Sequence, residues 1–333
     1  MNSGKKKILV RLPNWLGDLV MSSAFMSQLR DWEEDAIIEV ITRKHLVPLA
    51  ECIPGINKVH GFSKEDFSGM GGVTRFGRQF KDGKYDLFFC LPDSFSSATM
   101  AAATGAKERI GHRKEMRGFL LTKSYRKPEG KHRVDEYLNL LTSYYKRPVI
   151  ANSVTLKSKA KLPSLFPDPG GKPIIVCNFN SEAQSRRVPV TKAAAIVISL
   201  RTAIDAHYVL IGGPKELEHT NAIAQLAGDV INMAGLTTLD ELATMLANAD
   251  LTVTTDSGPA HLCNALGSST LVFFGAGDPH NTAPWNPDKR TILLGETACT
   301  CKLSNQCTQD EPPCLNSLSN HKIVEAAQQL LRR

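Results

Sequence analysis

Leu12-Pro-Asn-Trp-Leu-Gly-Asp18 follows an apolar run at residues 7–12 and precedes a helical pattern at residues 19–32. Thr255-Asp-Ser-Gly-Pro-Ala-His261 has the same setting far downstream, after the apolar run at 251–254. Each stretch predicts a turn from a strand into a helix that carries a glycine and an aspartate. Ligands of open α/β sheets bind at such turns, because these lie at the carboxyl ends of strands beside helix N-termini. One turn in each half predicts two domains that face a central cleft.

Strand-like and helix-like segments alternate through both halves of the chain. This repetition predicts mostly parallel sheets that are covered by helices on both faces. No G-x-G-x-x-G follows the first strand, which argues against a dinucleotide-binding oxidoreductase. Strands are expected at 7–12, 36–42, 85–90, 173–177, 208–211, 230–233, 251–254 and 271–274, and helices at 19–32, 191–204, 221–227, 239–247 and 323–331.

A break in this pattern predicts the domain boundary. Residues 158–172 include Pro163, Pro167, Pro169, Gly170 and Gly171, a composition that interrupts helices and strands. We therefore expect an N-terminal domain at 1–160, a linker at 161–172 and a C-terminal domain at 173–320. A closing helix at 321–333 can pack back on the N-terminal domain.

Composition is typical of a folded protein with enough apolar material for two cores. The chain has 333 residues, of which 42% are hydrophobic and 22% charged. The start of the chain is basic, but its apolar segment at 8–12 contains Arg11 and is followed by Pro13, so it is too short for a signal peptide. No apolar stretch approaches the roughly 20 residues that span a bilayer. We expect a cytoplasmic protein.

The net charge of +7 calls for an acidic partner, and much of the positive charge lies at residues 109–133. One interpretation of this run is a solvated face with a loop. The other is a docking surface for a phosphorylated or carboxylated acceptor, at an anionic membrane surface. Nucleic acid is disfavoured as a partner, because the run lacks interleaved aromatic residues and matches no nucleic-acid-binding module.

Four separate blocks together resemble glycosyltransferase family 9, and within it the lipopolysaccharide heptosyltransferases of the heptosyltransferase II branch. The resemblance implies a GT-B fold, which consists of two Rossmann-like doubly wound domains. It also implies inverting transfer of heptose from ADP-heptose to a lipid A-Kdo-heptose acceptor in the lipopolysaccharide inner core, at the cytoplasmic face of the inner membrane. The blocks are Val10-Arg-Leu-Pro-Asn-Trp-Leu-Gly-Asp-Leu-Val-Met-Ser22, Ile110-Gly-His-Arg-Lys-Glu-Met-Arg-Gly118, Ile211-Gly-Gly213 and Thr255-Asp-Ser-Gly-Pro-Ala-His-Leu262.

The resemblance assigns the catalytic base to Asp18, which would take the proton from the acceptor hydroxyl. The alternative is that Asp18 caps the helix that begins at residue 19. The acceptor would bind in the N-terminal domain, where Ser94, Ser96 and Ser97 follow another strand. Asp93 stands where related sequences often have asparagine. The acceptor candidates are Asn14, Trp15, Ser94, Arg113 and Arg117.

The donor would bind at the second turn. Ser257 and Gly258 can offer backbone N–H groups to the diphosphate at a helix start, while Asp256 would accept hydrogen bonds from sugar hydroxyls. His261 either helps to neutralise the diphosphate or only packs. Ser185-Arg-Arg-Val-Pro189 resembles the family's Ala-Lys-Arg-Trp-Pro, so Arg186 stands where that pattern has a lysine.

Weaker donor candidates surround these residues. Asn180 and Ser181 lie on the loop before Arg186, Glu216 follows a Gly-Gly-Pro turn and suits the ribose hydroxyls, and Gly235 lies in a segment at 233–236 that can line the adenine pocket. The alternative for Glu216 and the 233–236 segment is ordinary helix-start and strand-end chemistry.

No Asp-x-Asp occurs, so we expect catalysis without a divalent metal, with basic side chains and a helix dipole in its place. The spacing C-x-C-x5-C-x6-C near the end of the chain leaves two alternatives, a structural zinc site or free thiols. These cysteines are Cys299, Cys301, Cys307 and Cys314.

Two further functions remain open. One is a family 9 enzyme that uses another nucleotide-sugar. The other is a non-catalytic protein of the same fold that only binds a nucleotide-sugar.

Overall fold

The computed structural model describes residues 4–149, 153–301 and 304–332. The chain divides into two compact units, with the boundary between Lys157 and Ser158. Within the described ranges, no helix combines the length and the apolar character that crossing a membrane requires. Each unit is described separately below.

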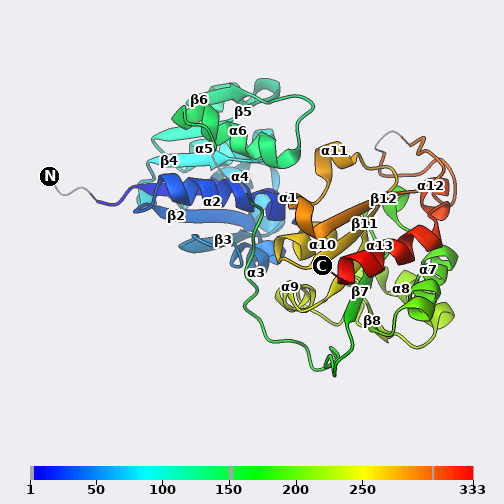
Figure 1. Ribbon diagram of the computed structural model, residues 1–333. Coiled ribbons are helices and arrows are strands. Elements are labelled where there is room, and N and C mark those ends of the chain that lie inside the picture. Colours follow the sequence, from blue (N-terminus) through cyan, green and yellow to red (C-terminus); the bar gives the residue numbers. More distant parts are fainter. Residues whose placement is uncertain (1–3, 150–152, 302–303, 333) are drawn as a thin grey trace. The chain divides into compact units, whose positions relative to one another are not determined.

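The first unit contains a six-stranded sheet of order β3-β2-β1-β4-β5-β6 in which all neighbours pair in parallel (Figure 1). The chain builds outward from β1 in one direction and then from β4 in the other. The point of reversal between β1 and β4 is where open α/β sheets bind ligands. The strands are β1 (Lys7–Arg11), β2 (Ile37–Arg43), β3 (Lys58–Phe62), β4 (Leu87–Cys90), β5 (Glu108–Arg113) and β6 (Lys123–Arg126).

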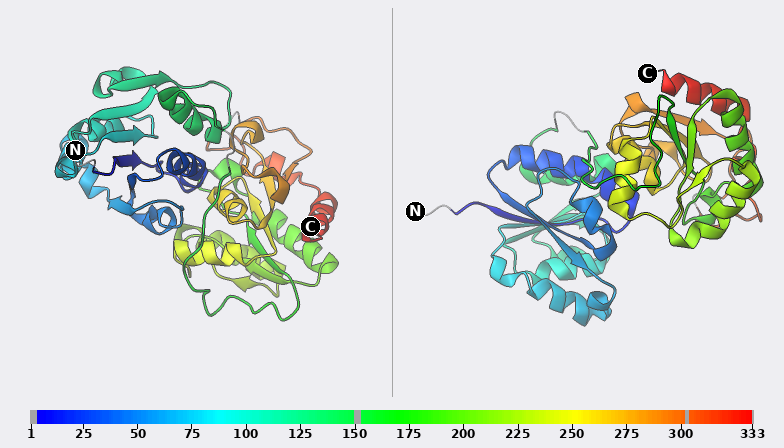
Figure 2. Two further views of the ribbon diagram at one scale, coloured as in Figure 1. Left: turned by 60° about the vertical axis from the view of Figure 1, so that its left-hand side comes forward. Right: turned by 90° about the horizontal axis from the view of Figure 1, so that it is seen from below.

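Helices cover both faces of this sheet (Figure 2). α2 packs with α6 on one face, and α4 packs with α5 on the other. Successive side chains of β4 point to opposite faces of the sheet and so contribute to the core on each face. Phe88 and Cys90 belong to the core beneath α4 and α5. The ring of Phe89 lies on the other face, 5.3 Å from the ring of Phe25 on α2. The helices are α1 (Leu16–Met21), α2 (Ser23–Trp32), α3 (Val47–Ala50), α4 (Gly69–Arg78), α5 (Phe95–Ala103) and α6 (Arg133–Tyr145).

The second unit repeats this topology. Its sheet has the order β12-β11-β10-β7-β8-β9, again parallel throughout, with the reversal between β7 and β10. The strands are β7 (Ile174–Asn178), β8 (His207–Leu210), β9 (Ile231–Asn232), β10 (Leu251–Thr255), β11 (Ser269–Phe274) and β12 (Arg290–Leu294). The helices are α7 (Val190–Ala203), α8 (Leu217–Ala227), α9 (Leu239–Ala247), α10 (Gly258–Ala265), α11 (Pro279–Thr282), α12 (Pro313–Asn316) and α13 (Asn320–Leu331).

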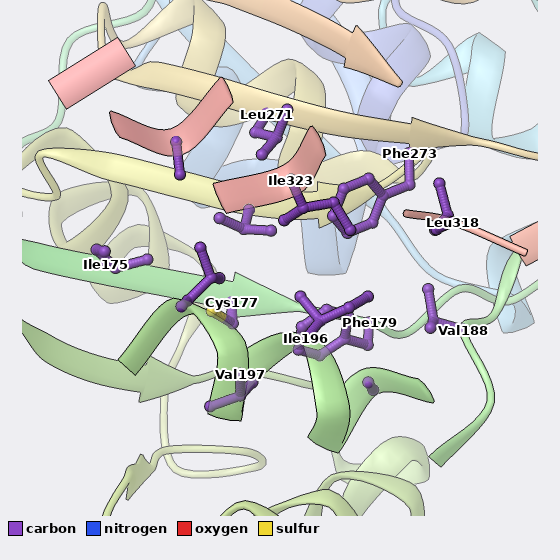
Figure 3. Close-up of a cluster of buried hydrophobic side chains, with 14 of the residues drawn as sticks. Ile175, Cys177, Phe179, Val188, Ile196, Val197, Leu271, Phe273, Leu318 and Ile323 are labelled. Atoms are coloured by element: carbon purple, nitrogen blue, oxygen red, sulfur yellow. The ribbon is translucent and has the colours of Figure 1, made fainter. Parts of the chain in front are cut away.

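The main core of the second unit lies between its sheet and α7, α8 and α13 (Figure 3). Leu271 and Phe273 of β11 point into this core, while Val272 and Phe274 belong to a smaller cluster with Ala260 of α10 on the other face. α10 is therefore held against the sheet by side chains that alternate with those of the main core.

The predicted pair of Rossmann-like α/β domains is confirmed, and α9 has the predicted bounds. α1 begins at Leu16, three residues before the predicted start. The strands β3, β5, β6 and β12 were not predicted. They lie at or next to the edges of the two sheets and are only partly buried, and β3, β5 and β6 carry polar and charged residues instead of continuous apolar runs.

The closing helix belongs to the second unit. The apolar face of α13 is buried there, where it packs on α7, β10, β11 and β12. The expectation that residues 321–333 also pack back on the N-terminal domain stays a prediction. Ile323, Ala327 and Leu330 of this face are each at most 2% exposed, so hydrophobic burial fixes the helix there.

Candidate active site

Asp18 lies at the point of reversal of the first sheet, in the first turn of the helix that follows β1. It is the third residue of α1, and Trp15 occupies the N-cap position. Asp18 is therefore not the cap of a helix that starts at residue 19, although a carboxylate in a first turn still interacts favourably with the helix dipole. Its side chain is 27% exposed, so the carboxylate is open to a reactant.

Two side chains from α6 hold one oxygen of this carboxylate. The hydroxyl of Tyr137 donates a hydrogen bond of 3.2 Å to Asp18 Oδ1, and Arg133 Nε lies 3.4 Å from the same oxygen. Arg133 and Tyr137 are four residues apart, so they share one face of the helix. Burial, together with the charge of Asp18, holds the pKa of Tyr137 well above its usual value, which keeps its hydroxyl a donor.

A chain of charges extends from Asp18 along the same sheet edge. Arg133 Nη1 lies 2.7 Å from Glu136 Oε2, and Lys127 Nζ bridges Glu136 at 3.0 Å and Asp93 at 2.9 Å. Asp93 follows β4, which is the other strand at the reversal point. The residues of the basic run at 109–133 therefore do not all serve one surface. Lys127 and Arg133 neutralise carboxylates of the site.

The other acceptor candidates lie at the carboxyl ends of β1, β4 and β5. Arg11 is buried and donates to the side-chain oxygen of Asn14, which fixes the loop before α1. Trp15 is 63% exposed. Ser94 is the N-cap of α5, where its hydroxyl accepts a hydrogen bond from Ser97 N at 3.2 Å. Arg113 is exposed at the end of β5.

Arg117 does not fit the predicted acceptor contact. Its side chain is fully buried and donates to the carbonyl oxygens of His112, Pro92 and Ser94 and to the hydroxyl of Ser97. Arg117 therefore positions the loop after β4, and Ser94 on that loop is the residue exposed to solvent.

The second unit places an uncapped helix N-terminus at its own point of reversal. α10 follows β10, and its N-cap Ser257 makes no side-chain cap. The hydroxyl of Ser257 accepts a hydrogen bond of 2.9 Å from Asn178 Nδ2 at the end of β7 and donates to Thr255 O. The first-turn N–H groups of an α-helix have no intrahelical acceptor and attract anions. This turn can bind a phosphate. His261 lies in the same helix and is buried.

Asp256 and Arg186 form an ion pair beside this turn. Arg186 Nη1 lies 3.2 Å from Asp256 Oδ2, without hydrogen-bond geometry. The Asp256 side chain is only 3% exposed, and burial raises its pKa to about 6 although Arg186 opposes the shift. A Cβ at Gly277 would lie 2.0 Å from Asp256 Oδ2, so only glycine fits at this position with Asp256 in place. A cation and a carboxylate thus lie beside the N-terminus of α10.

The cysteine-bearing segment holds the turn that carries Arg186. Ser185 N donates to Asn305 O at 3.2 Å and its hydroxyl donates to Ser304 O at 2.6 Å. Gln184 accepts a 2.8 Å hydrogen bond from Cys307 N and donates to Asp310 O at 3.0 Å. We call this set of four hydrogen bonds the Arg186 clamp.

The four clustered cysteines are free thiols in the structure. Cys301 Sγ lies 3.3 Å from Cys307 Sγ, and burial next to Cys299 raises the pKa of Cys314 to about 11. Among the residues that the structure describes, no three His, Cys, Asp or Glu side chains are arranged as metal ligands.

The weaker donor candidates have structural partners. Glu216 accepts a 2.7 Å hydrogen bond from Gly213 N, and Asn180 bridges Ile211 O and the hydroxyl of Thr220. The hydroxyl of Ser181 accepts from Ala183 N. Gly235 has φ +71 and donates to Gly212 O, which places the 233–236 turn beside the Gly-Gly turn at the end of β8.

Sequence reasoning missed Tyr137, Gly277 and Asn178. The spacing of Arg133 and Tyr137 on one helical face was a usable signal, but only the fold brings that face to Asp18. Gly277 and Asn178 carry no local motif, and their contacts join separate strand ends.

Two Rossmann-like units in one chain, each with polar side chains at its point of reversal, are the architecture of a large class of glycosyltransferases. The sequence of this chain matches the model of glycosyltransferase family 9, the heptosyltransferase family, over residues 73–312. The chain belongs to glycosyltransferase family 9 and is a transferase enzyme.

Relatives with established names agree with this assignment. Lipopolysaccharide heptosyltransferase 2 of Escherichia coli K12 is 27% identical over 317 residues, which cover 86% of this chain and 88% of that protein. The enzyme of the same name from Salmonella typhimurium LT2 is 28% identical over the same shares. The solved structure of ADP-heptose lipopolysaccharide heptosyltransferase II from E. coli has a TM-score of 0.81 at 24% identity and covers 98% of both chains.

Proposed function

We propose that this chain transfers heptose, with inversion, from ADP-heptose to an acceptor in the inner core of lipopolysaccharide. The observation that carries the proposal is Asp18, a partly exposed carboxylate at the reversal point of the first sheet with one oxygen held by Tyr137 and Arg133. The match to heptosyltransferases 2 over most of the chain supports this choice of substrates.

In the proposed reaction, the acceptor hydroxyl loses its proton to the Oδ2 of Asp18, since Oδ1 is already held. The acceptor oxygen bonds to the anomeric carbon of the heptose as the bond from that carbon to the diphosphate breaks, and ADP leaves. The charge that develops on the departing diphosphate is stabilised by Arg186 and by the N–H groups at the start of α10. These groups supply positive charge without a divalent metal.

The acceptor is assigned to the first unit, through Asn14, Trp15, Ser94 and Arg113. The donor is assigned to the second unit. There Asp256 would accept hydrogen bonds from sugar hydroxyls, Glu216 would bind the ribose, and the turn containing Gly235 would lie against adenine. Because the proposed acceptor carries a lipid, we also propose that the protein works at the cytoplasmic face of the inner membrane as a peripheral protein.

The test is Asp18→Ala with Asp18→Asn beside it. A general base contributes about 10²–10⁴-fold, so both variants should lose transfer activity by at least about 10²-fold. The affinity for ADP, measured by calorimetry, should stay within about threefold of the parent, because the residues proposed to bind ADP all belong to the second unit. Full activity of either variant would exclude Asp18 as the base.

A panel of nucleotide-sugars separates the remaining alternatives. ADP-heptose should raise the melting temperature most, and transfer to an inner-core acceptor should follow. A larger shift with another nucleotide-sugar would favour a different donor. A shift without turnover on any acceptor would favour a non-catalytic binding protein.

A further inference from the structure

Two large apolar side chains of the first unit point into solvent. Met116 is 81% exposed and Phe119 is 71% exposed. Both belong to the 3-10 helix η4 (Glu115–Leu120), which joins β5 to β6. A 3-10 helix has three residues per turn, so residues three apart share a face. Met116 and Phe119 therefore form an outer face, while Arg117 and Leu120 form the inner face.

The inner face makes this helix a rigid platform. Arg117 is fully buried and donates to carbonyl oxygens on the loop after β4, and Leu120 packs on the core beneath α4 and α5. The exposure of Met116 and Phe119 is thus set by fixed contacts on the opposite side. It does not come from a loose loop end.

A third apolar side chain extends the outer face toward the acceptor side. Phe95, in the first turn of α5, is 37% exposed, and its ring centroid lies 6.1 Å from that of Phe119. Phe95 directly follows Ser94, which is one of the proposed acceptor residues. We call Phe95, Met116 and Phe119 the apolar wedge. Contiguous exposed apolar groups of this kind mark interaction surfaces.

Cations border the apolar wedge. Arg113 ends β5 and is in register with Arg126 at the end of β6, and Lys114 precedes the 3-10 helix. All three side chains are exposed. Arg126 has an ion pair with Glu129, but both side chains are 84% exposed, so this pair contributes little and exchanges readily for another anion. Exposed apolar groups with exposed cations on the neighbouring strand ends match an anionic bilayer, whose phosphates lie above its acyl chains.

We propose that the apolar wedge inserts into the headgroup region of an anionic lipid bilayer, while Lys114 and Arg126 contact lipid phosphates. The inference rests on the proposed function, since it places the strand ends that carry Ser94 and Asp18 at the surface from which a lipid-anchored acceptor projects. A second copy of the chain is a poorer occupant, because a symmetric interface would bring like-charged rims together.

The test uses the full chain and vesicles. Binding to vesicles of phosphatidylglycerol and phosphatidylcholine is measured by co-sedimentation, with pure phosphatidylcholine as the reference lipid. The double variant Met116→Ser/Phe119→Ser should bind the anionic vesicles at least about tenfold more weakly. Lys114→Gln/Arg126→Gln should weaken binding to the anionic vesicles and leave binding to pure phosphatidylcholine unchanged. Added salt should remove the difference between this variant and the parent on anionic vesicles.

A matched control removes two exposed apolar side chains from the second unit. Leu165 is 60% exposed and Leu226 is 55% exposed, and Leu165→Ser/Leu226→Ser should bind vesicles like the parent. The melting temperature of each variant checks that it is folded. Substitutions at these exposed positions should leave the melting temperature unchanged. Equal vesicle binding by the parent and Met116→Ser/Phe119→Ser would overturn the proposal. So would a parent dimer that this variant converts to a monomer.

Activity assays separate this inference from the proposed function. With a deacylated, water-soluble acceptor, Met116→Ser/Phe119→Ser should keep the parent rate, while transfer to acceptor embedded in anionic vesicles should fall by about tenfold. If the parent fails to glycosylate the soluble acceptor, the proposed function is wrong. If the parent glycosylates the soluble acceptor but Met116→Ser/Phe119→Ser behaves like the parent in the vesicle measurements, only the proposed docking surface is wrong.

Discussion

At the scale of single residues, the geometry of Asp18 is decided by its partners on α6. Tyr137 and Arg133 both contact Oδ1, so Oδ2 is the oxygen that we expect to accept the proton. Burial opposes the charge of Arg133, yet the negative charges of Asp18 and Glu136 help to raise its pKa, so it remains a cation at the site. Tyr137 is a positioning residue in this arrangement, because it acts on the reaction only through Asp18.

Removing the hydroxyl in Tyr137→Phe should lower kcat by about five- to tenfold and leave the KM for the donor unchanged, since the lost hydrogen bond aligns only the base. Steady-state kinetics with the donor and the acceptor varied separately measure this split. In an Asp18→Ala background the same substitution should have no further effect, because the group that it positions is gone. Additive losses would show that Tyr137 acts by another route.

Asp256 makes stability depend on pH. Its folded-state pKa is about 6, while the unfolded value is near 3.8, so the folded chain binds this proton more tightly. Stability from this group is therefore present at low pH and is lost as pH rises through 6. At pH 8 the buried, ionised carboxylate costs up to about 3 kcal/mol of unfolding free energy.

Asp256→Asn should remove that cost, so the variant should be more stable than the parent at pH 8, with the difference shrinking toward zero near pH 4. Denaturant unfolding between pH 4 and 8 measures it. The same variant should bind ADP-heptose more weakly, because an amide is a poorer acceptor for sugar hydroxyls. A variant that is less stable than the parent at every pH would contradict this account.

At the scale of elements, the Arg186 clamp joins the segment that follows β12 to the turn that follows β7. Two side chains, Gln184 and Ser185, contribute three of its four hydrogen bonds. The clamp sets the approach of Arg186 to the N-terminus of α10. A cation that binds phosphate loses affinity when its backbone is free to move, because ordering it then costs entropy on binding.

Gln184→Ala/Ser185→Ala should raise the Kd for ADP by about five- to tenfold, as measured by calorimetry, while the fold of both units is retained. Gln225→Ala is the control, since Gln225 is an exposed residue of α8 away from the clamp. An unchanged Kd in the double variant would show that Arg186 needs no support from the cysteine-bearing segment.

At the scale of the whole molecule, the chain consists of two units that each have their own sheet and core. All the described groups assigned to the donor lie in the second unit, and Asp18 with its partners lies in the first. Because α13 packs on the second unit, that unit includes the C-terminal helix.

A fragment of residues 158–333 should therefore fold alone and bind ADP with a Kd within about threefold of the full chain. A fragment of residues 1–157 should fold without binding ADP. Circular dichroism and calorimetry on the two fragments check this. A shorter second fragment that ends at residue 319 should fail to fold, because it exposes the core beneath α13.

The architecture and the two aspartate turns could be predicted from sequence, because they depend on local pattern. Buried central strands are continuous apolar runs, and Asp18 and Asp256 directly follow such runs. β5 and β6 escaped prediction because they carry charged residues of the basic run in place of a continuous apolar run. Arg113 and Arg117 were equal candidates in sequence, and only the fold exposes one and buries the other.

The sequence by itself determined the α/β repetition, the family and the positions of the two turns, since each of these is encoded within a few tens of residues. The tertiary structure alone decided which neighbours those turns have. It brought Tyr137 and Arg133 to Asp18, Gly277 to Asp256, the cysteine-bearing segment to Arg186 and α13 to the second sheet. The physical reason is that these contacts join residues far apart in the chain, and parallel strands bring such residues together at one edge of a sheet.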